Sequence, residues 1–260
     1  MNLAPERMER IHALWDELAD FDVGQADEAA RHLMGALAGM AQAVNAVWFG
    51  AVRMDDGPRD DPLLGWRVPH MLFLHAVPQH VELARATQLR WNQRKLDPSF
   101  LAGLERAGHF SVWANSRVMP AEWFESDFFK SYWAVRHIRD AAYVGFPLNA
   151  IANSIFGFHR SETLGDFSEE DLATLTYALR GIKWFHRALM LGHGLMVASS
   201  PLTPAEKRVL SLLLGDTTEK LMARELALSV TTVHGHVTAI YRKFGVTSRA
   251  ALTRLWLGGV

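Results

Sequence analysis

One segment near the carboxyl end, residues 230–244, combines hydroxyl, imidazole and cationic side chains with regularly spaced apolar ones. Its apolar residues recur at intervals of three and four, which predicts a helix with one buried face. The opposite face offers hydroxyl groups, an imidazole and two cations, and no carboxylate: Thr231, Thr232, His234, Thr238, Arg242 and Lys243. Such side chains pair with base edges and phosphates, so this face fits the major groove of duplex DNA.

Charge is divided unevenly along the chain. Residues 201–260 hold eight basic and four acidic side chains, whereas residues 1–200 hold 19 basic and 24 acidic ones. The formal net charge of −1 therefore averages a basic module of +4 and an acidic segment of −5. A basic module favours binding to a phosphate backbone through counterion release. Chance asymmetry is the alternative on charge alone.

The elements that must position the 230–244 helix are also predicted from local signals. A helix begins where Thr203 can cap it, Pro204 suits its first turn and Glu206 completes a capping box; it continues through Leu213.

A second short helix is expected over residues 218–226, after a break at Gly215. Ser229 then caps the helix from Val230 to Phe244, and Gly245 ends it. The result is a compact all-α module.

This module resembles the LuxR-type helix-turn-helix of the LuxR, NarL and FixJ regulators. The matching stretch is LTPAEKRVLSLLLGDTTEKLMARELALSVTTVHGHVTAIYRKFGVTSRAAL. The resemblance implies DNA binding and places the family's base and phosphate contacts on the six polar residues of the 230–244 helix. Three positions depart from the family: His234 replaces a frequent Lys, Leu221 replaces the usual Glu, and Gly235 costs about 1 kcal/mol in a helix interior.

Helix and strand patterns alternate over the first 191 residues. We expect helices at 5–18 and 27–44, strands at 46–54 and 66–77 around a loop at 55–62, a helix at 81–95, a short helix beginning at Asp97-Pro98, strands at 142–148 and 151–158, and a long helix from Ser168 to Gly192. That order predicts an α+β protein, with an amino-terminal α/β/α sandwich containing an antiparallel sheet and then a small all-α helix-turn-helix domain. The predicted domains are 1–191 and 202–260, joined by a linker at 192–201.

Asp97-Pro98, Trp113 and the strands at Val144–Pro147 and Ser154–Phe158 follow an order that resembles the autoinducer-binding domain of quorum-sensing LuxR proteins, itself similar to GAF and PAS folds. The resemblance implies a pocket where Asp97 accepts a hydrogen bond from a ligand N–H and Trp113 packs on the ligand's polar head. The family's upstream Trp and Tyr would fall near Ala84 and Gln88 and are lost. A standard acyl-homoserine lactone is therefore not the expected ligand.

Aromatic residues are dense between Trp91 and Phe158, which predicts either an ordinary core or a pocket for a flat aromatic or apolar ligand. Arg90, Arg94, Arg117 or Asp97 could fix the polar end of such a ligand. The predicted ligand-binding set is Trp91, Asp97, Trp113, Phe128, Tyr132 and Trp133.

Several kinds of chemistry are not expected. The chain has no cysteine, which removes disulfides, thiolate metal sites and thiol nucleophiles. Its 12 histidines lack carboxylates at ligand spacing, and no Gly-rich phosphate loop or GxSxG motif is present. We expect no metal, no cofactor and no enzymatic activity. Without a long apolar run or a signal peptide, a cytoplasmic protein with no membrane contact is expected.

These features together predict a ligand-responsive transcription regulator, in which a small molecule in the first domain alters how a homodimer binds a pseudo-palindromic DNA site. Two alternatives remain open: a dimeric regulator that needs no ligand, and a protein-binding adaptor without DNA contact. The apolar stripe over 168–192 packs either against a second subunit or against its own domain.

Overall fold

The computed structural model describes residues 3–54, 61–76, 82, 85–87, 89–90, 93, 96–196 and 202–257. These residues form two compact units that do not follow the order of the sequence. The first unit joins Met1–Leu14 to Arg31–Lys183, and the second joins Trp15–Ala30 to Trp184–Val260. The predicted linker at 192–201 lies partly outside the described residues, and the predicted domain boundaries stay predictions.

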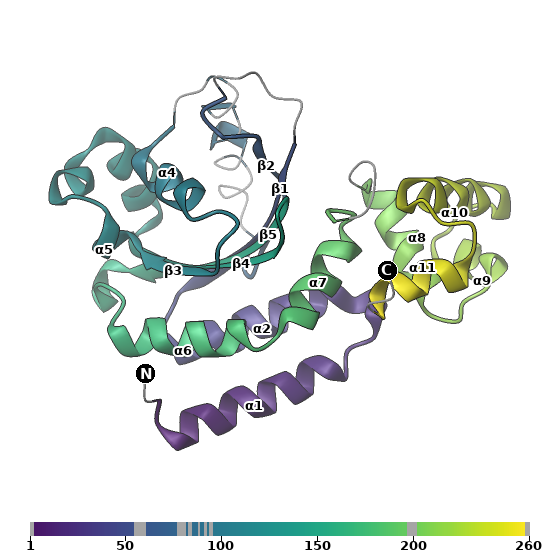
Figure 1. Ribbon diagram of the computed structural model, residues 1–260, viewed down its shortest axis with the longest axis horizontal. Helices are drawn as coiled ribbons and strands as arrows, with labels where there is room; N and C mark the ends of the chain where they lie inside the picture. The colour runs from purple at the N-terminus through teal and green to yellow at the C-terminus, as the bar shows by residue number, and fades with distance from the viewer. Residues whose placement is uncertain are drawn as a thin grey trace. The chain divides into compact units, whose positions relative to one another are not determined.

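A five-stranded antiparallel sheet is the centre of the first unit (Figure 1). Its strands are β1 (Asn45–Arg53), β2 (Trp66–Phe73), β3 (Ser111–Ala114), β4 (Ile138–Asn149) and β5 (Ala152–Ser161), in the spatial order β2-β1-β5-β4-β3. Both predicted strand pairs are antiparallel neighbours in this sheet. The sequence patterns did not predict β3, which is four residues long and pairs only with β4 among the described strands.

Helices cover both faces of the sheet, which confirms the predicted α/β/α sandwich. Helices α2 (Ala26–Met40) and α6 (Glu169–Arg180) lie along one face, and α4 (Pro98–Glu105) lies over the other (Figure 1). Helix α1 (Pro5–Ala19) contacts α6, where Arg7 Nη1 donates to Thr174 Oγ1 at 3.0 Å.

Short helical segments follow β3 and were not predicted. They are α5 (Asn115–Val118), η2 (Ala121–Glu125), η3 (Phe129–Trp133) and η4 (Ala134–Arg136); η1 (Val23–Gln25) and η5 (Glu162–Leu164) lie elsewhere in the chain. Their aromatic residues join a buried cluster around Trp123, Phe129 and Trp133. Most of the predicted 55–62 loop and 81–95 helix lies outside the described residues.

The predicted helix from Ser168 to Gly192 is two helices. Ser168 does cap the first, α6, through a capping box with Asp171. The helix ends at Gly181, and α7 (Lys183–Gly192) follows. Glycine has the highest backbone entropy cost in a helix, so the break falls where helix propensity is lowest.

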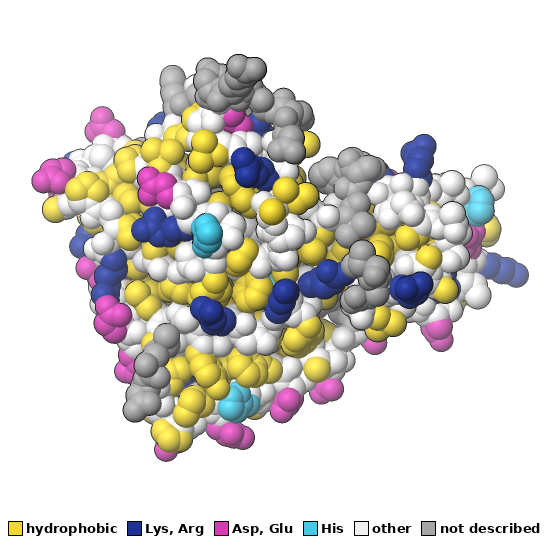
Figure 2. All heavy atoms as spheres, viewed as in Figure 1, with side chains coloured by type: hydrophobic (Ala, Val, Ile, Leu, Met, Phe, Trp, Pro, Cys, Tyr) yellow, Lys and Arg dark blue, Asp and Glu magenta, His cyan; other side chains and the backbone are white. Residues whose placement is uncertain are grey.

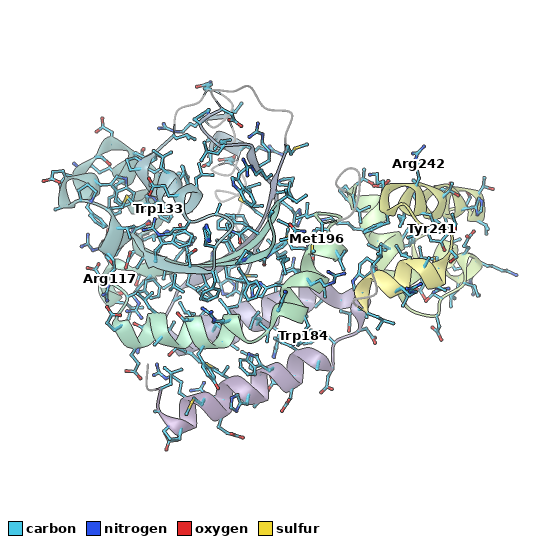
Figure 3. The ribbon with its side chains drawn as sticks, viewed as in Figure 1. Arg117, Trp133, Trp184, Met196, Tyr241 and Arg242 are labelled. Atoms are coloured by element: carbon cyan, nitrogen blue, oxygen red, sulfur yellow. The ribbon has the colours of Figure 1, made fainter. Side chains whose placement is uncertain are left out.

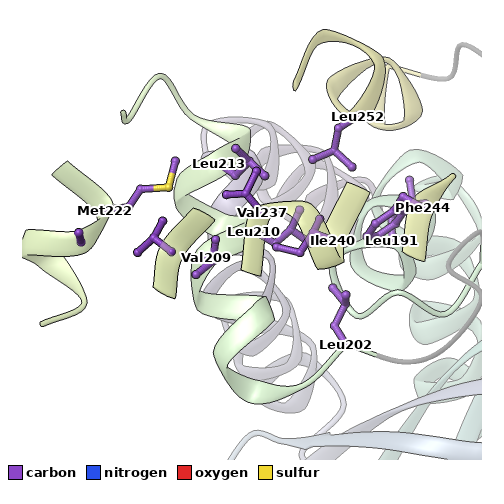
Figure 4. Packing of buried hydrophobic residues seen from close by; sticks show 12 residues of the cluster. Leu191, Leu202, Val209, Leu210, Leu213, Met222, Val237, Ile240, Phe244 and Leu252 are labelled. Atoms are coloured by element: carbon purple, nitrogen blue, oxygen red, sulfur yellow. The ribbon is translucent and has the colours of Figure 1, made fainter. Parts of the chain in front are cut away.

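The remaining helices belong to the second unit: α8 (Pro204–Leu214), α9 (Glu219–Glu225), α10 (Val230–Phe244) and α11 (Arg249–Trp256). Their apolar sides meet in one core, which includes Val209, Leu210, Met222, Val237 and Ile240 (Figure 4). All but α11 were predicted. Within the described ranges, no helix combines the length and apolarity that crossing a bilayer requires.

Candidate nucleic-acid interface and ligand cavity

Helix α10 carries the candidate nucleic-acid interface, and local contacts set both of its ends. Ser229 Oγ accepts a hydrogen bond from the Thr232 N–H at 3.0 Å, and Gly245 follows the helix with a left-handed φ of 64°. Glycine adopts that conformation without steric cost. The predicted bounds of this helix are confirmed.

One side of α10 is fixed in the core of the second unit. Val233, Val237, Ile240 and Phe244 are each no more than 3% exposed and pack against α8 and α9. Because these side chains lock the rotation of the helix about its axis, the opposite side is held toward solvent.

The solvent side of α10 holds five of the six residues predicted to contact DNA. Thr231, Thr232, His234, Thr238 and Arg242 are exposed. Arg242 extends away from the helix (Figure 3), and Lys or Arg and His side chains project from the surface that α10 occupies (Figure 2). This surface offers hydroxyl, imidazole and guanidinium groups in one row, as recognition of a groove requires.

Lys243 lies differently from its predicted place on this surface. Its Nζ donates to Glu206 Oε2 at 2.7 Å, and its side chain is 15% exposed. The Lys243 ammonium therefore links the end of α10 to the start of α8, and a DNA contact from it would require this ion pair to open.

Two carboxylates thus border a helix that itself contains none. Besides Glu206, Glu219 of α9 reaches His234, with 3.2 Å between Glu219 Oε2 and His234 Nδ1. Burial by itself would raise the pKa of Glu206, but hydrogen bonds from Lys243 and from Thr203 hold that pKa below its ordinary value. Glu206 therefore stays ionised and retains its cation.

Other basic residues of this unit have roles that the sequence patterns did not separate. Lys220 and Arg224 of α9 are exposed and add cations beside α10. Arg249, in contrast, donates to backbone carbonyls in the last turn of α8 and just after it, including Leu213 O at 2.7 Å and Thr217 O at 2.9 Å. Arg249 therefore caps the end of a helix, where cations are favoured.

A separate cavity of about 120 Å³ lies in the first unit, between the sheet and α4. It is lined mainly by apolar and aromatic side chains: Phe49, Ala51, Leu63, Trp66, Val68, Ser99, Phe100, Gly103, Leu104, Ala107, Trp113, Tyr143, Asn153 and Ile155. This volume is somewhat below the roughly 150 Å³ of an apolar cavity that holds benzene, so a single small ring is about the largest group that it suits.

The alternation of the strands decides which residues reach the cavity. Phe49 pairs with Ile155, Ala51 with Asn153, and Trp113 with Tyr143 in the registers of the sheet. Directly opposed residues point to the same face, so these six side chains form one wall. Trp48, Ser154, Phe156 and Phe158 alternate with them and are 0% exposed on the other face.

The predicted ligand-binding residues are divided by the structure. Trp113 lines the cavity. Phe128, Tyr132 and Trp133 belong to the adjoining aromatic cluster and are not among its described lining residues. Phe100 lies between the two sets, with ring centroids 5.7 Å from Phe128 and 6.1 Å from Tyr132.

Trp91, the sixth predicted ligand residue, lies outside the described residues, as does Arg94. Tyr143 belongs to the predicted aromatic-rich region but not to the predicted ligand-binding set, and Asn153 was not predicted. The alternation of β4 and β5 is the signal that places them on the same face as Ile155.

Asp97 differs most from its expected role. It is 5% exposed and caps α4, accepting from Ser99 N at 2.9 Å and Ser99 Oγ at 2.6 Å. Trp123 Nε1 lies 3.0 and 3.1 Å from its two carboxylate oxygens. The side chain is therefore bound by donors of its own chain and is not among the described lining residues of the cavity.

Comparison with known proteins gives a family for the carboxyl-terminal helices α8 to α11. Residues 200–256 match the luxR family of bacterial regulatory proteins. None of the curated proteins matches the chain.

Several solved structures resemble this chain weakly, and their sequence identity to it is low. The VqsR LBD domain from Pseudomonas aeruginosa has a TM-score of 0.47 at 13% identity, over 72% of this chain and 98% of that one. SdiA in complex with octanoyl-rac-glycerol has a TM-score of 0.47 at 14% identity, over 100% of this chain and 97% of that one. Escherichia coli SdiA in the space group P6522 has a TM-score of 0.46 at 13% identity, over 97% of both chains.

The matched residues contain the capped helices α8, α9 and α10. They also contain the buried apolar seam of α10, formed by Val233, Val237, Ile240 and Phe244, and the exposed polar row on its other side. Residues 200–256 are therefore a helix-turn-helix domain of the luxR family of bacterial regulatory proteins.

Proposed function

We propose that this protein is a transcription regulator that binds duplex DNA through α10 and responds to a small molecule bound in its first unit. The observation that carries the proposal is the row of exposed polar residues on α10, held outward by the buried seam and completed by Arg242. In helix-turn-helix domains the second helix of the motif enters the major groove while the first crosses the backbone. Helix α9 is the first helix of the motif, and its exposed Lys220 and Arg224 suit contact with the DNA backbone.

Substitution of Arg242 tests the DNA-binding half. The variant Arg242→Ala should weaken binding of the full chain to a duplex by roughly tenfold, because one charge-assisted hydrogen bond contributes about 1.5 kcal/mol. If Arg242 contacts a phosphate, the slope of log K against log salt should also become shallower by about 0.9. Fluorescence anisotropy with a labelled promoter fragment, repeated over a range of salt, measures both quantities.

Arg10→Ala is the matched control, since Arg10 is an exposed arginine in the first unit. It should leave both the affinity and the salt slope unchanged. If Arg242→Ala binds DNA as tightly as the unaltered chain, or if the chain binds no promoter fragment at low salt, α10 is not a DNA-binding surface. An adaptor that binds another protein would then be the better account.

The cavity under α4 supports the ligand half of the proposal. It is concave, largely apolar and lined by a few polar groups, as small-molecule sites usually are. If the protein has one conformation that binds DNA and another that does not, a ligand that binds the first more tightly increases its population. In this proposal the protein is cytoplasmic, and two copies of the chain form a homodimer that binds a pseudo-palindromic DNA site. Sedimentation of the chain with and without duplex measures the copy number.

A further inference from the structure

Two polar atoms of the cavity wall have no hydrogen-bond partner among the described residues: Trp113 Nε1 and Asn153 Oδ1. Trp113 is 6% exposed and Asn153 is 2% exposed, so bulk solvent does not satisfy them. Buried polar groups are nearly always paired, and an unpaired one costs about 1–3 kcal/mol. The wall therefore presents one unused N–H donor and one unused carbonyl acceptor.

The surrounding residues hold the Trp113 ring in place. Tyr143 stacks on it with ring centroids 5.1 Å apart and an interplanar angle of 23°. A Cβ on Gly103 of α4 would lie 3.4 Å from Trp113 Cζ2, and a Cβ on Gly157 would lie 2.8 Å from the Tyr143 ring. Because these glycines leave room for the two rings, the indole N–H has a fixed position.

Asn153 is fixed by the sheet. Its backbone lies in β5 between Ala51 of β1 and Pro147 of β4, so its side chain cannot change faces without loss of register. The donor on β3 and the acceptor on β5 are thus both set by regular strands, a placement that favours a preorganised site.

The described part of the cavity wall carries no charged side chain. Its described lining residues include no Asp, Glu, Lys, Arg or His. Asp97 lies nearby, but its carboxylate is engaged by Ser99 and Trp123. Arg106 stacks on Trp113 with its guanidinium carbon 5.8 Å from the ring centroid, but it donates to Ala102 O and is not among the described lining residues. An ion held among these uncharged lining residues would lose hydration, which is costly.

We propose that the cavity selects an uncharged, ring-sized ligand whose carbonyl oxygen accepts from Trp113 Nε1–H and whose N–H or O–H donates to Asn153 Oδ1. Primary amides and hydroxy-carbonyl compounds on an aromatic ring belong to this class. The inference rests on the proposed function, because it specifies the ligand of the same cavity. It replaces Asp97, the predicted acceptor, with Asn153.

Three small probes of similar shape test this selectivity on the full chain: benzamide, benzoate and toluene. Isothermal titration at pH 7 gives the affinities, and at that pH benzoate is an anion. Benzamide should bind at least tenfold more tightly than benzoate, since only benzoate must bring a charge into the cavity. Toluene should bind through the apolar wall alone.

Variants then assign the contacts. Asn153→Leu and Trp113→Phe each remove one hydrogen-bonding group and should weaken benzamide binding by about three- to tenfold. Both should leave toluene binding within about twofold, since toluene makes no hydrogen bond. Ile155→Val is the matched control, because it trims an apolar lining residue and should affect benzamide and toluene equally. The two variants lie on different strands, so either gives a result if the other does not fold.

The outcomes separate this inference from the proposed function. If none of the three probes binds, the cavity is not a ligand site and the ligand half of the proposed function fails. If toluene binds but benzoate matches benzamide, or if neither Asn153→Leu nor Trp113→Phe weakens benzamide selectively, the ligand class is wrong while the cavity remains a ligand site.

Discussion

At the scale of single residues, Glu206 connects two helices of the second unit, α8 and α10. Its Oε2 accepts from the Thr203 N–H and from Lys243 Nζ, both at 2.7 Å. One carboxylate therefore closes the start of α8 and holds the end of α10. The capping box is a local pattern that the sequence predicts, whereas the ion pair joins residues 37 positions apart and depends on how the helices pack.

Removing the charge of Glu206 should be costly. Glu206→Gln keeps a side chain that can complete the capping box but removes the negative charge from the contact with Lys243. The free energy of unfolding should fall by about 1–3 kcal/mol, since a mostly buried ion pair loses its charge–charge attraction. Urea denaturation measures this loss. Glu219→Gln, whose partner His234 is exposed, should cost no more than about 0.5 kcal/mol.

Glu206 also makes the free energy of unfolding depend on pH. The pKa of Glu206 in the folded protein lies below its ordinary value of 4.5, so its stabilising effect is fully present above pH 4.5. The effect is lost as the pH falls through the folded pKa. On acidification below pH 4.5, the unaltered chain should lose stability faster than Glu206→Gln. Parallel acid-denaturation curves would contradict this account of the ion pair.

At the scale of elements, the turn between α9 and α10 stores a small strain. Ala227 has a φ of 53°, in the left-handed region that disfavours a Cβ. The turn closes α9 with hydrogen bonds from Leu228 N to Ala223 O at 2.9 Å and from Ala227 N to Arg224 O at 3.3 Å. This is the helix-ending arrangement in which glycine is usually found at the position of Ala227.

Ala227→Gly should therefore stabilise the protein by about 0.5–1 kcal/mol, since relief of the strained φ outweighs the added freedom of the unfolded chain. Thermal unfolding with and without the substitution measures the change. Ala239→Gly is the matched control: the same substitution within α10 should destabilise by about 1 kcal/mol. If both substitutions destabilise alike, the turn is not strained.

At the scale of the whole molecule, residues from near both ends of the chain are combined in the second unit. The backbone at Gly24 approaches α8 so closely that a Cβ there would lie 2.6 Å from Ser211 O. Beside it, Asp27 Oδ1 lies 2.9 Å from His193 Nε2, and His193 Nδ1 contacts Lys207 Nζ. This chain of three side chains links the start of α2, the end of α7 and α8.

Lys207 gives this contact a pH dependence. Burial lowers the pKa of Lys207 to about 8, and the attraction of Asp27 opposes that shift only in part. Below pH 8 the ammonium is present in both folded and unfolded chains. Between pH 8 and the ordinary value of 10.5 the folded chain loses its proton first, so stability should rise with pH over that range.

Lys207→Met has no such proton and provides the comparison. The melting temperature of the unaltered chain should rise relative to that of Lys207→Met as the pH increases from 8 toward 10.5. Differential scanning calorimetry at several pH values measures the difference. Lys220→Met, at an exposed position in α9, should show a constant difference over the same range. A constant difference for Lys207→Met as well would contradict a buried ammonium.

Much of the helix-turn-helix domain at residues 200–256 is predictable because its signals are local. Thr203, Ser229 and Gly245 mark helix ends through contacts within a few residues, and the buried seam of α10 follows from its spacing. The two long strand pairs of the sheet are predictable for a similar reason, since each is a neighbouring pair along the chain. Asp97 as the cap of α4 also follows from Asp97-Pro98.

By itself, then, the sequence determined the class of the carboxyl-terminal helical domain, the bounds of α10 and the polar row on its outer side, because caps and periodicity act over one or two turns. Only the tertiary structure decided that Lys243 binds Glu206, that Asp97 is held by Trp123, and that Trp113 and Asn153 face one cavity. Those pairings join residues distant in the chain. Which donor meets which acceptor depends on strand register and helix packing, and neither leaves a local signal in the sequence.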